Sequence, residues 1–118
     1  MERSEPLDVI FYKTTAGNEP VREWLRSLPK ADRAQIGIDI WKAQSEWPIG
    51  MPHVRALGKG LHEVRSNLPD GIARTIFFVE ESEMVLLHGF IKKTEKTPLE
   101  DKALALKRKD AHIKAEKE

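Results

Sequence analysis

The stretch LHEVRSNLPDGIARTIFFVEESEMVLLHGFIKKTEKTP, residues 61–98, decides the fold. Its β-branched, aromatic and other apolar runs predict three strands, at residues 61–66, 72–80 and 84–91. A turn containing Pro and Gly joins the first two strands, and a short charged turn joins the last two. Connections this short favour an antiparallel meander.

Charged side chains interrupt the first two strands. Strand alternation places Glu63 and Arg65 on one face of the first strand and Arg74 on one face of the second. A guanidinium inside an apolar strand is costly to bury unless it is paired. Two interpretations are open: the three residues form a structural ion pair or a solvated face, or the arginines belong to a functional site.

The third strand adds an imidazole and an ammonium group. Alternation predicts that His88 shares a face with Met84, Leu86, Phe90 and Lys92. If the faces of the three strands coincide, basic and imidazole groups gather on one side of the sheet. The gathered residues are Arg65, Arg74, His88 and Lys92, and Lys93 follows directly.

The residues before the meander predict one strand and two helices. Residues 7–12 predict a strand, and Asn18 is a suitable N-cap for a helix at residues 19–28. Pro29 separates that helix from a second one at residues 30–47. The two helices are expected to pack on the sheet as a hairpin, with the three tryptophans of the chain in the core.

The remaining segments complete the predicted topology. Residues 48–60 predict a loop in which residues 54–57 either pack on the core or form a brief strand. A last helix is expected at about residues 98–115, with Thr97 and Glu100 as a capping box and a charged end that frays. The sequence therefore predicts an α+β fold in the order β-α-α-β-β-β-α, with an antiparallel sheet of about four strands and two helices on one face.

Length and composition restrict the class of protein. A chain of 118 residues predicts a single domain, residues 1–118. The absence of cysteine excludes disulfides, thiolate metal sites and a Cys nucleophile, and agrees with a reducing, cytoplasmic compartment. No apolar run approaches a membrane span, and the N-terminal residues do not resemble a signal peptide. The net charge of +1 indicates no partner, although residues 92–118 hold nine Lys and Arg against six Asp and Glu.

No general catalytic motif is present. The sequence lacks GxGxxG, a P-loop and HExxH, and the spacing of its four histidines predicts no metal site and no cofactor. The basic groups that remain are those that bind phosphate, since Arg offers a bidentate fork and Lys a point charge. Two loops carry further basic residues: Arg55, Lys59 and Lys96. These residues either form an RNA-binding surface or are ordinary exposed charges.

The order of elements resembles the RelE/ParE superfamily of toxins from bacterial toxin–antitoxin systems. The segments LHEVRSNLPDGIARTIFFVE and VLLHGFIKKTEKTP, followed by a Lys-rich helix, resemble its HigB-like, phage-derived branch. The resemblance covers residues 7–109, and residues 63–98 are its most specific part. It implies a RelE-like fold and a HigA-like partner antitoxin with a helix-turn-helix domain, which neutralises the toxin and represses the operon.

The resemblance further implies a ribosome-dependent endoribonuclease that cleaves mRNA without a metal. In that reaction the ribose 2′-OH attacks the adjacent phosphate, and basic residues stabilise the charge that builds there. By position in the motifs, Arg65 and Arg74 match the sheet arginines of the active face. Lys92 and Lys93 match the basic residues just after the last strand. No membrane partner is implied.

The resemblance leaves the general base open. Several HigB-like toxins carry a catalytic His or Tyr near the C-terminus, where this chain has only His112, and Tyr12 is its sole tyrosine. His88 suits proton transfer by its chemistry, since Arg and Lys neighbours lower an imidazole pKa, but it suits a hydrogen-bonded core residue slightly better. Two alternative functions also remain open: a non-catalytic ParE-like inhibitor of DNA gyrase, and an inactive toxin that only binds its antitoxin.

Overall fold

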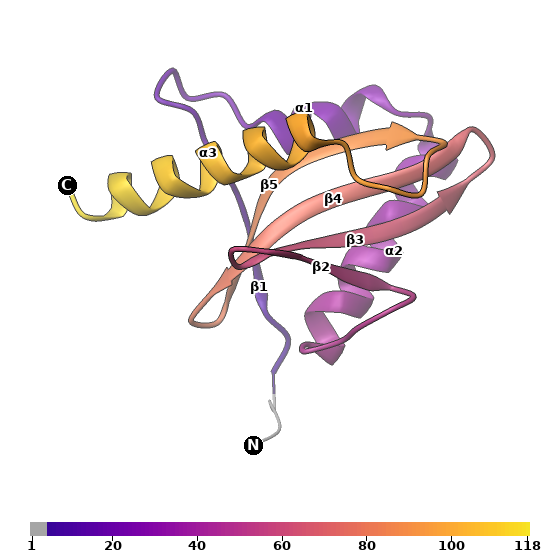
Figure 1. Ribbon diagram of the computed structural model, residues 1–118, viewed down its shortest axis with the longest axis horizontal. Coiled ribbons are helices and arrows are strands. Elements are labelled where there is room, and N and C mark those ends of the chain that lie inside the picture. The colour runs from indigo at the N-terminus through magenta and orange to yellow at the C-terminus, as the bar shows by residue number, and fades with distance from the viewer. Residues whose placement is uncertain (1–4) are drawn as a thin grey trace.

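Three helices and one five-stranded sheet form the part of the chain described by this computed structural model, residues 5–118 (Figure 1). The strand order is β1-β5-β4-β3-β2, with β1 parallel to β5 and every other pair antiparallel. The predicted α+β fold and its meander are confirmed, and the segment left open between loop and strand is a fifth strand, β2. The elements are β1 (Asp8–Phe11), α1 (Pro20–Ser27), α2 (Lys30–Glu46), β2 (Val54–Gly58), β3 (Leu61–Leu68), β4 (Gly71–Glu80), β5 (Glu83–Lys92) and α3 (Leu99–Glu116).

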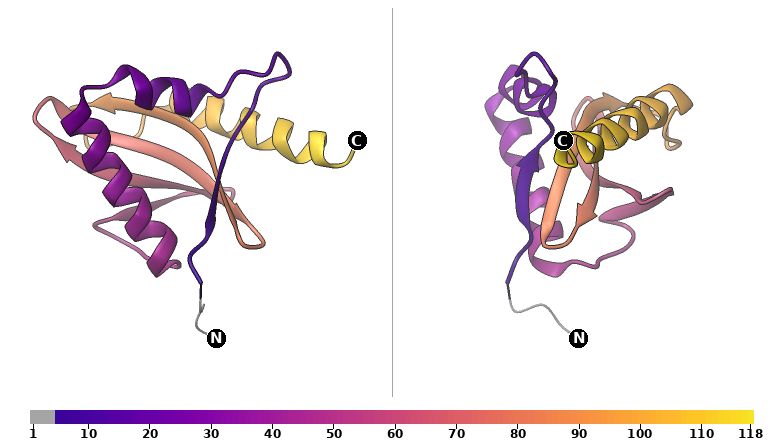
Figure 2. Two further views of the ribbon diagram at one scale, coloured as in Figure 1. Left: turned by 180° about the vertical axis from the view of Figure 1, so that it is seen from behind. Right: turned by 90° about the vertical axis from the view of Figure 1, so that its left-hand side faces the viewer.

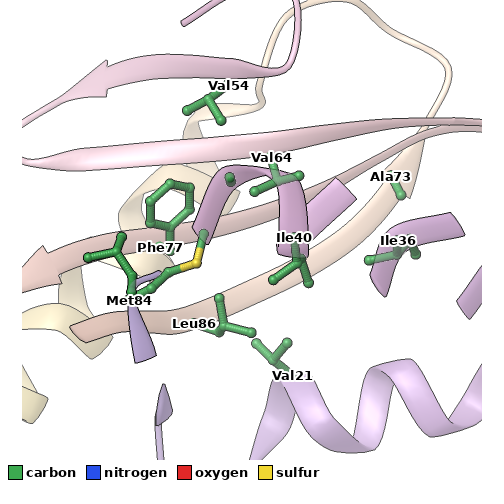
Figure 3. Packing of buried hydrophobic residues seen from close by; sticks show 11 residues of the cluster. Val21, Ile36, Ile40, Val54, Val64, Ala73, Phe77, Met84 and Leu86 are labelled. Carbon is green, nitrogen blue, oxygen red and sulfur yellow. The ribbon is translucent and has the colours of Figure 1, made fainter. Parts of the chain in front are cut away.

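The sheet lies between two layers of helix. As predicted, α1 and α2 cover one face, and the right-hand view of Figure 2 shows α3 on the other. The larger core lies under α1 and α2, where Val21 and Ile40 pack with Phe77 and Leu86 of the sheet (Figure 3). The second core lies under α3 and contains Leu61, Ile76, Phe78, Val85, Leu87, Phe90 and Ala105.

A bulge in β5 changes which side chains face α3. His88 pairs with Ile76 whereas Leu86 pairs with Phe77, so Leu87 is an additional residue on β5. The prediction of one common face along β5 was wrong, because an inserted residue reverses the alternation beyond it. Met84 and Leu86 pack in the core under α1 and α2, whereas His88, Phe90 and Lys92 lie on the α3 side.

The helix ends differ from the predictions. Glu19, and not Asn18, occupies the N-cap position of α1. The capping box of α3 does not form, because the hydroxyl of Thr97 donates to the carboxylate of Glu63 instead. The charged end of α3 does not fray but continues as helix to Glu116.

The prediction that all three tryptophans lie in the core was wrong for one of them. Trp24 and Trp47 pack against the core, but Trp41 is 57% exposed and Ile38, one turn earlier on α2, is 62% exposed. The apolar residues of α2 are divided between two sides of the helix, which explains why their spacing predicted its buried face poorly. No helix in the described part of the chain has the length and apolar composition of a bilayer span.

Candidate functional site

The strand register brings the predicted basic residues onto one face of the sheet. Arg65 lies opposite Arg74, which in turn lies opposite Phe90 on β5. Residues opposite each other in an antiparallel pair share a face, so these side chains all point toward the α3 side. We call this surface the basic face; its residues are Arg55, Arg65, Arg74, His88 and Lys92, with the acidic Glu63 among them.

Glu63 is the buried centre of the basic face. Its side chain is fully buried on β3, and it accepts a hydrogen bond from the Arg65 Nη1 at 3.0 Å. The hydroxyl of Thr97 donates to its two carboxylate oxygens at 2.7 and 3.0 Å. The Nε of Arg74 lies 3.6 Å from the same carboxylate. A buried charge is tolerated only when it is paired and hydrogen-bonded, and Glu63 meets both conditions.

Arg74 fastens the exit loop, residues 93–98, to the sheet. Its side chain is fully buried, and its Nη2 donates to the backbone carbonyl of Thr94. Its Nη1 lies 3.5 Å from the carbonyl of Lys92. Burial lowers the pKa of Arg74 and the nearby Glu63 raises it, so the guanidinium keeps its charge. The structure therefore places Glu63, Arg65 and Arg74 in an ion-pair network.

Arg65 and Arg55 converge on one exposed residue of the exit loop. The side chain of Arg65 is 9% exposed, and its Nη2 lies 3.1 Å from the Glu95 carboxylate, which is itself 85% exposed. The Nη1 of Arg55 donates to the backbone carbonyl of Glu95 at 3.2 Å. A carboxylate and a phosphate present similar oxygens to a guanidinium. Glu95 thus occupies a position at which Arg65 could hold a phosphate group.

His88 faces the first turn of α3. Its Nε2 lies 2.7 Å from Oδ1 of Asp101, and its ring stacks on that of Phe90 with centroids 5.3 Å apart. Burial lowers the pKa of His88, and the hydrogen bond to Asp101 opposes that shift without cancelling it. The predicted effect of Lys92, a further lowering, is present but smaller than that of burial. The lowered pKa favours the neutral form of the imidazole.

Asp101 is the site residue that the sequence analysis missed. Besides His88, its carboxylate lies 3.4 Å from the Nζ of Lys92, which is also 3.6 Å from Glu100. The available signal was the acidic first turn of α3, where the helix macrodipole favours carboxylates. Acidic residues of this kind indicate where a helix starts, but they do not predict that Asp101 will contact β5.

The other predicted basic residues are divided between two places. Lys93 and Lys96 are exposed on the exit loop, next to the basic face. Arg55 and Lys96 also line a shallow pocket of about 140 Å³. Lys59 lies apart, in the turn between β2 and β3, where its carbonyl accepts a hydrogen bond from Lys109 at 2.6 Å.

Neither His112, near the C-terminus, nor Tyr12, near the N-terminus, lies on the basic face. His112 lies about 16 Å beyond Asp101 along α3, at 1.5 Å per residue. Its Nε2 is 3.5 Å from the carboxylate of Glu116. Tyr12 lies under Arg108, and both Tyr12 and His112 line a cavity of about 750 Å³ between β1 and the end of α3. His112 and Glu116 stand four residues apart, a metal-ligand spacing on a helix that the sequence analysis overlooked.

Comparisons with known proteins agree with the fold. The model of a family described as phage derived protein Gp49-like (DUF891) matches residues 23–110, about three quarters of the chain. A search of curated proteins finds no match. The family match confirms the phage-derived part of the predicted resemblance. The chain belongs to the phage-derived Gp49-like family, a RelE-like family of toxin-related proteins.

Proposed function

We propose that this protein is the toxin of a type II toxin–antitoxin pair and that it cleaves mRNA on the ribosome. The proposed reaction is that of the HigB-like toxins: the 2′-OH of one nucleotide attacks the adjacent phosphate, and no metal takes part in the step. Membership of a toxin-related family supports the general class. The reaction itself rests on the basic face.

The observation that carries the proposal is the convergence of Arg55 and Arg65 on Glu95, beside the exposed Lys93 and Lys96. Two guanidinium groups and two ammonium groups gathered at one edge can hold an RNA backbone through its phosphates. Glu95 is largely exposed and belongs to a loop, so an RNA phosphate can displace its carboxylate from Arg65. A binding surface for an acidic ligand is the simplest use of this arrangement.

The basic residues of the sheet and of the neighbouring loops then have three roles. Arg65, Lys92 and Lys93 contact the scissile phosphate and stabilise the negative charge that grows on it. Arg74 is fully buried, so it acts by holding the exit loop in place and adding its charge from below. Arg55, Lys59 and Lys96 bind the flanking RNA.

His88 is the general base of this proposal. Asp101 orients the ring through Nε2 in the manner of a carboxylate–histidine pair, which leaves Nδ1 to accept the 2′-OH proton. A neutral imidazole is required for that step, and burial lowers the pKa of His88, which favours the neutral form. His112 is excluded from this role because it lies at the far end of α3.

The proposed partner is a HigA-like antitoxin with a helix-turn-helix domain. Such a partner neutralises the toxin in the cytoplasm and binds the operator of the shared operon. The open reading frame next to the gene is the place to look for it. Co-expression of that frame should restore growth and yield a complex with the toxin.

Induced expression in bacteria tests the proposal. Incorporation of labelled methionine should stop before incorporation of labelled thymidine, and Lys93→Ala should relieve the arrest. Lys30→Ala, which removes an exposed lysine at the start of α2, is the matched control and should leave the arrest unchanged. An early stop of DNA synthesis would instead support gyrase inhibition. Normal growth with a folded, antitoxin-binding protein would support an inactive toxin.

A further inference from the structure

Three side chains of metal-ligand type meet where the end of β4 contacts the last turns of α3. Glu80 is the final residue of β4, and His112 and Glu116 lie one turn apart on α3. Their nearest ligand atoms all lie within 4.8 Å of one another. The group comes from two elements distant in sequence, so the packing of α3 on the sheet creates it.

The spacing of these atoms suits a small cation. The Nε2 of His112 is 3.8 Å from Oε2 of Glu80 and 3.5 Å from Oε2 of Glu116. Ligands bound to tetrahedral zinc at about 2.0–2.2 Å lie about 3.3–3.6 Å apart. The two distances to His112 come within a few tenths of an ångström of this range, and the carboxylate oxygens of Glu80 and Glu116 lie within 4.8 Å of each other.

Two of these ligand atoms are buried without a hydrogen-bond partner among residues 5–118: Oε2 of Glu80 and Nε2 of His112. Unpaired buried polar atoms are rare and costly, so each calls for an explanation. The ring of His112 is held in place by an edge-on contact with Phe78, with centroids 5.8 Å apart. These two unpartnered atoms lie 3.8 Å apart.

The packing also brings the carboxyl groups of Glu80 and Glu116 near one another, with ligand atoms within 4.8 Å. Two carboxylates at such a separation repel each other, and a cation bound between them offsets that repulsion.

We propose that Glu80, His112 and Glu116 bind one divalent transition-metal ion, and that zinc fits the site best. One imidazole nitrogen and two carboxylates suit Zn²⁺, whereas Mg²⁺ and Ca²⁺ prefer sites built only of oxygen. Three protein ligands leave a fourth position for water. The ion would join the end of α3 to the end of β4.

This site is distinct from the basic face. Asp101 lies about 22 Å before Glu116 along α3, at 1.5 Å per residue. An ion at the far end of the helix cannot reach a phosphate beside Lys92. Its effect is structural: it fixes the helix whose first turn carries Asp101 onto His88. The proposal therefore stands whether or not the chain cleaves RNA.

The test is titration of Zn²⁺ into the untagged, full-length protein after treatment with a chelator. Calorimetry and native mass spectrometry should show one ion per chain, and the melting temperature should rise on binding. Glu116→Gln should weaken binding by at least about 10–100-fold, the loss seen when a supporting residue of a metal site is removed. The side chain of Glu116 is 43% exposed, so this variant should keep its fold. His112→Gln should have the same effect on affinity.

The matched control is His53→Gln, which removes an exposed histidine outside the site. It should leave the affinity unchanged. Equal weakening by His53→Gln and His112→Gln would show surface binding and overturn the proposal, as would the absence of a one-to-one complex. Co²⁺ gives a second readout, since an intense visible absorption typical of four-coordinate cobalt should appear in the wild type and disappear in Glu116→Gln. A cobalt spectrum that is the same in both proteins would also contradict the site.

Discussion

Glu63 unites the basic face, because side chains from β3, β4 and the exit loop all meet at its carboxylate. The guanidinium of Arg74 also contacts the loop backbone on both sides of Lys93, at the carbonyls of Lys92 and Thr94. Removal of one member of a buried ion pair leaves the other without compensation, which costs about 3–5 kcal/mol. We therefore predict that Arg74→Ala lowers the free energy of unfolding by about that amount in urea denaturation. Lys93→Ala, on the exposed part of the same loop, should change it by less than about 0.5 kcal/mol. Equal stability of the two variants would contradict the network.

Glu95 competes with RNA in the proposed site, so its neutralisation should strengthen binding. In Glu95→Gln the Nη2 of Arg65 loses its carboxylate partner and is free for a phosphate, while Nη1 stays on Glu63. We expect a several-fold increase in affinity for a short RNA, measured by fluorescence anisotropy at low salt, where charge effects are least screened. Glu23→Gln makes the same change of net charge at an exposed position on α1. If both variants bind RNA equally, the effect is one of overall charge and Arg65 is not the contact.

Two partly buried histidines should make the protein less stable in mild acid. Burial lowers the pKa of both His62 and His88, so in the pH range just below 6.5 the unfolded chain binds more protons than the folded one. By linkage, stability is then highest above about pH 6.5 and falls as the pH drops through the folded-state pKa values. Urea denaturation should show a smaller free energy of unfolding at pH 5.5 than at pH 7, and His62→Gln should reduce that difference. An unchanged pH dependence in His62→Gln would contradict the assignment.

At the scale of elements, the contact between α1 and β5 depends on a glycine. A Cβ built on Gly89 would lie 2.2 Å from the ring of Trp24, so no larger residue fits without displacing α1. Overpacking of this kind typically costs about 1–3 kcal/mol, which is the loss we predict for Gly89→Ala in thermal or urea denaturation. The control is Gly37→Ala in the middle of α2, where a Cβ would meet nothing within 4 Å. It should stabilise the protein by about 0.5–1 kcal/mol.

The elements were predictable from sequence where local patterns determine them. Turn residues and apolar runs located β3, β4 and β5, and Pro29 marked the boundary between α1 and α2. The bulge at Leu87 was not predictable, because nothing in the local pattern shows an inserted residue. The predicted capping box does not form for a related reason. Instead of capping the start of α3, the hydroxyl of Thr97 donates a hydrogen bond to the buried carboxylate of Glu63, which is distant in sequence.

At the scale of the molecule, the sequence predicted the cations of the site and Glu63 but missed its other acidic residues. Arg65 and Arg74 lie opposite each other on paired strands, whereas His88 and Lys92 reach the same face only because of the bulge at Leu87. Their acidic partners on the loop and on α3, Glu95 and Asp101, meet them only after the chain has folded. The placement of α3 over the sheet therefore determines that Asp101 meets His88 and Lys92.

The central claim is that the basic face cleaves mRNA on the ribosome, and a reconstituted reaction tests it most directly. Purified protein is added to ribosomes programmed with a defined mRNA, and cleavage is mapped by primer extension, with free mRNA as the control. The account predicts cuts in ribosome-bound mRNA only. It also predicts that the double variant Lys92→Ala, Lys93→Ala is about 10²–10³-fold slower, the usual loss when charge stabilisation of a transition state is removed, with an unchanged circular dichroism spectrum. Absence of cleavage by the folded wild-type protein, or equal cleavage by the double variant, would contradict it.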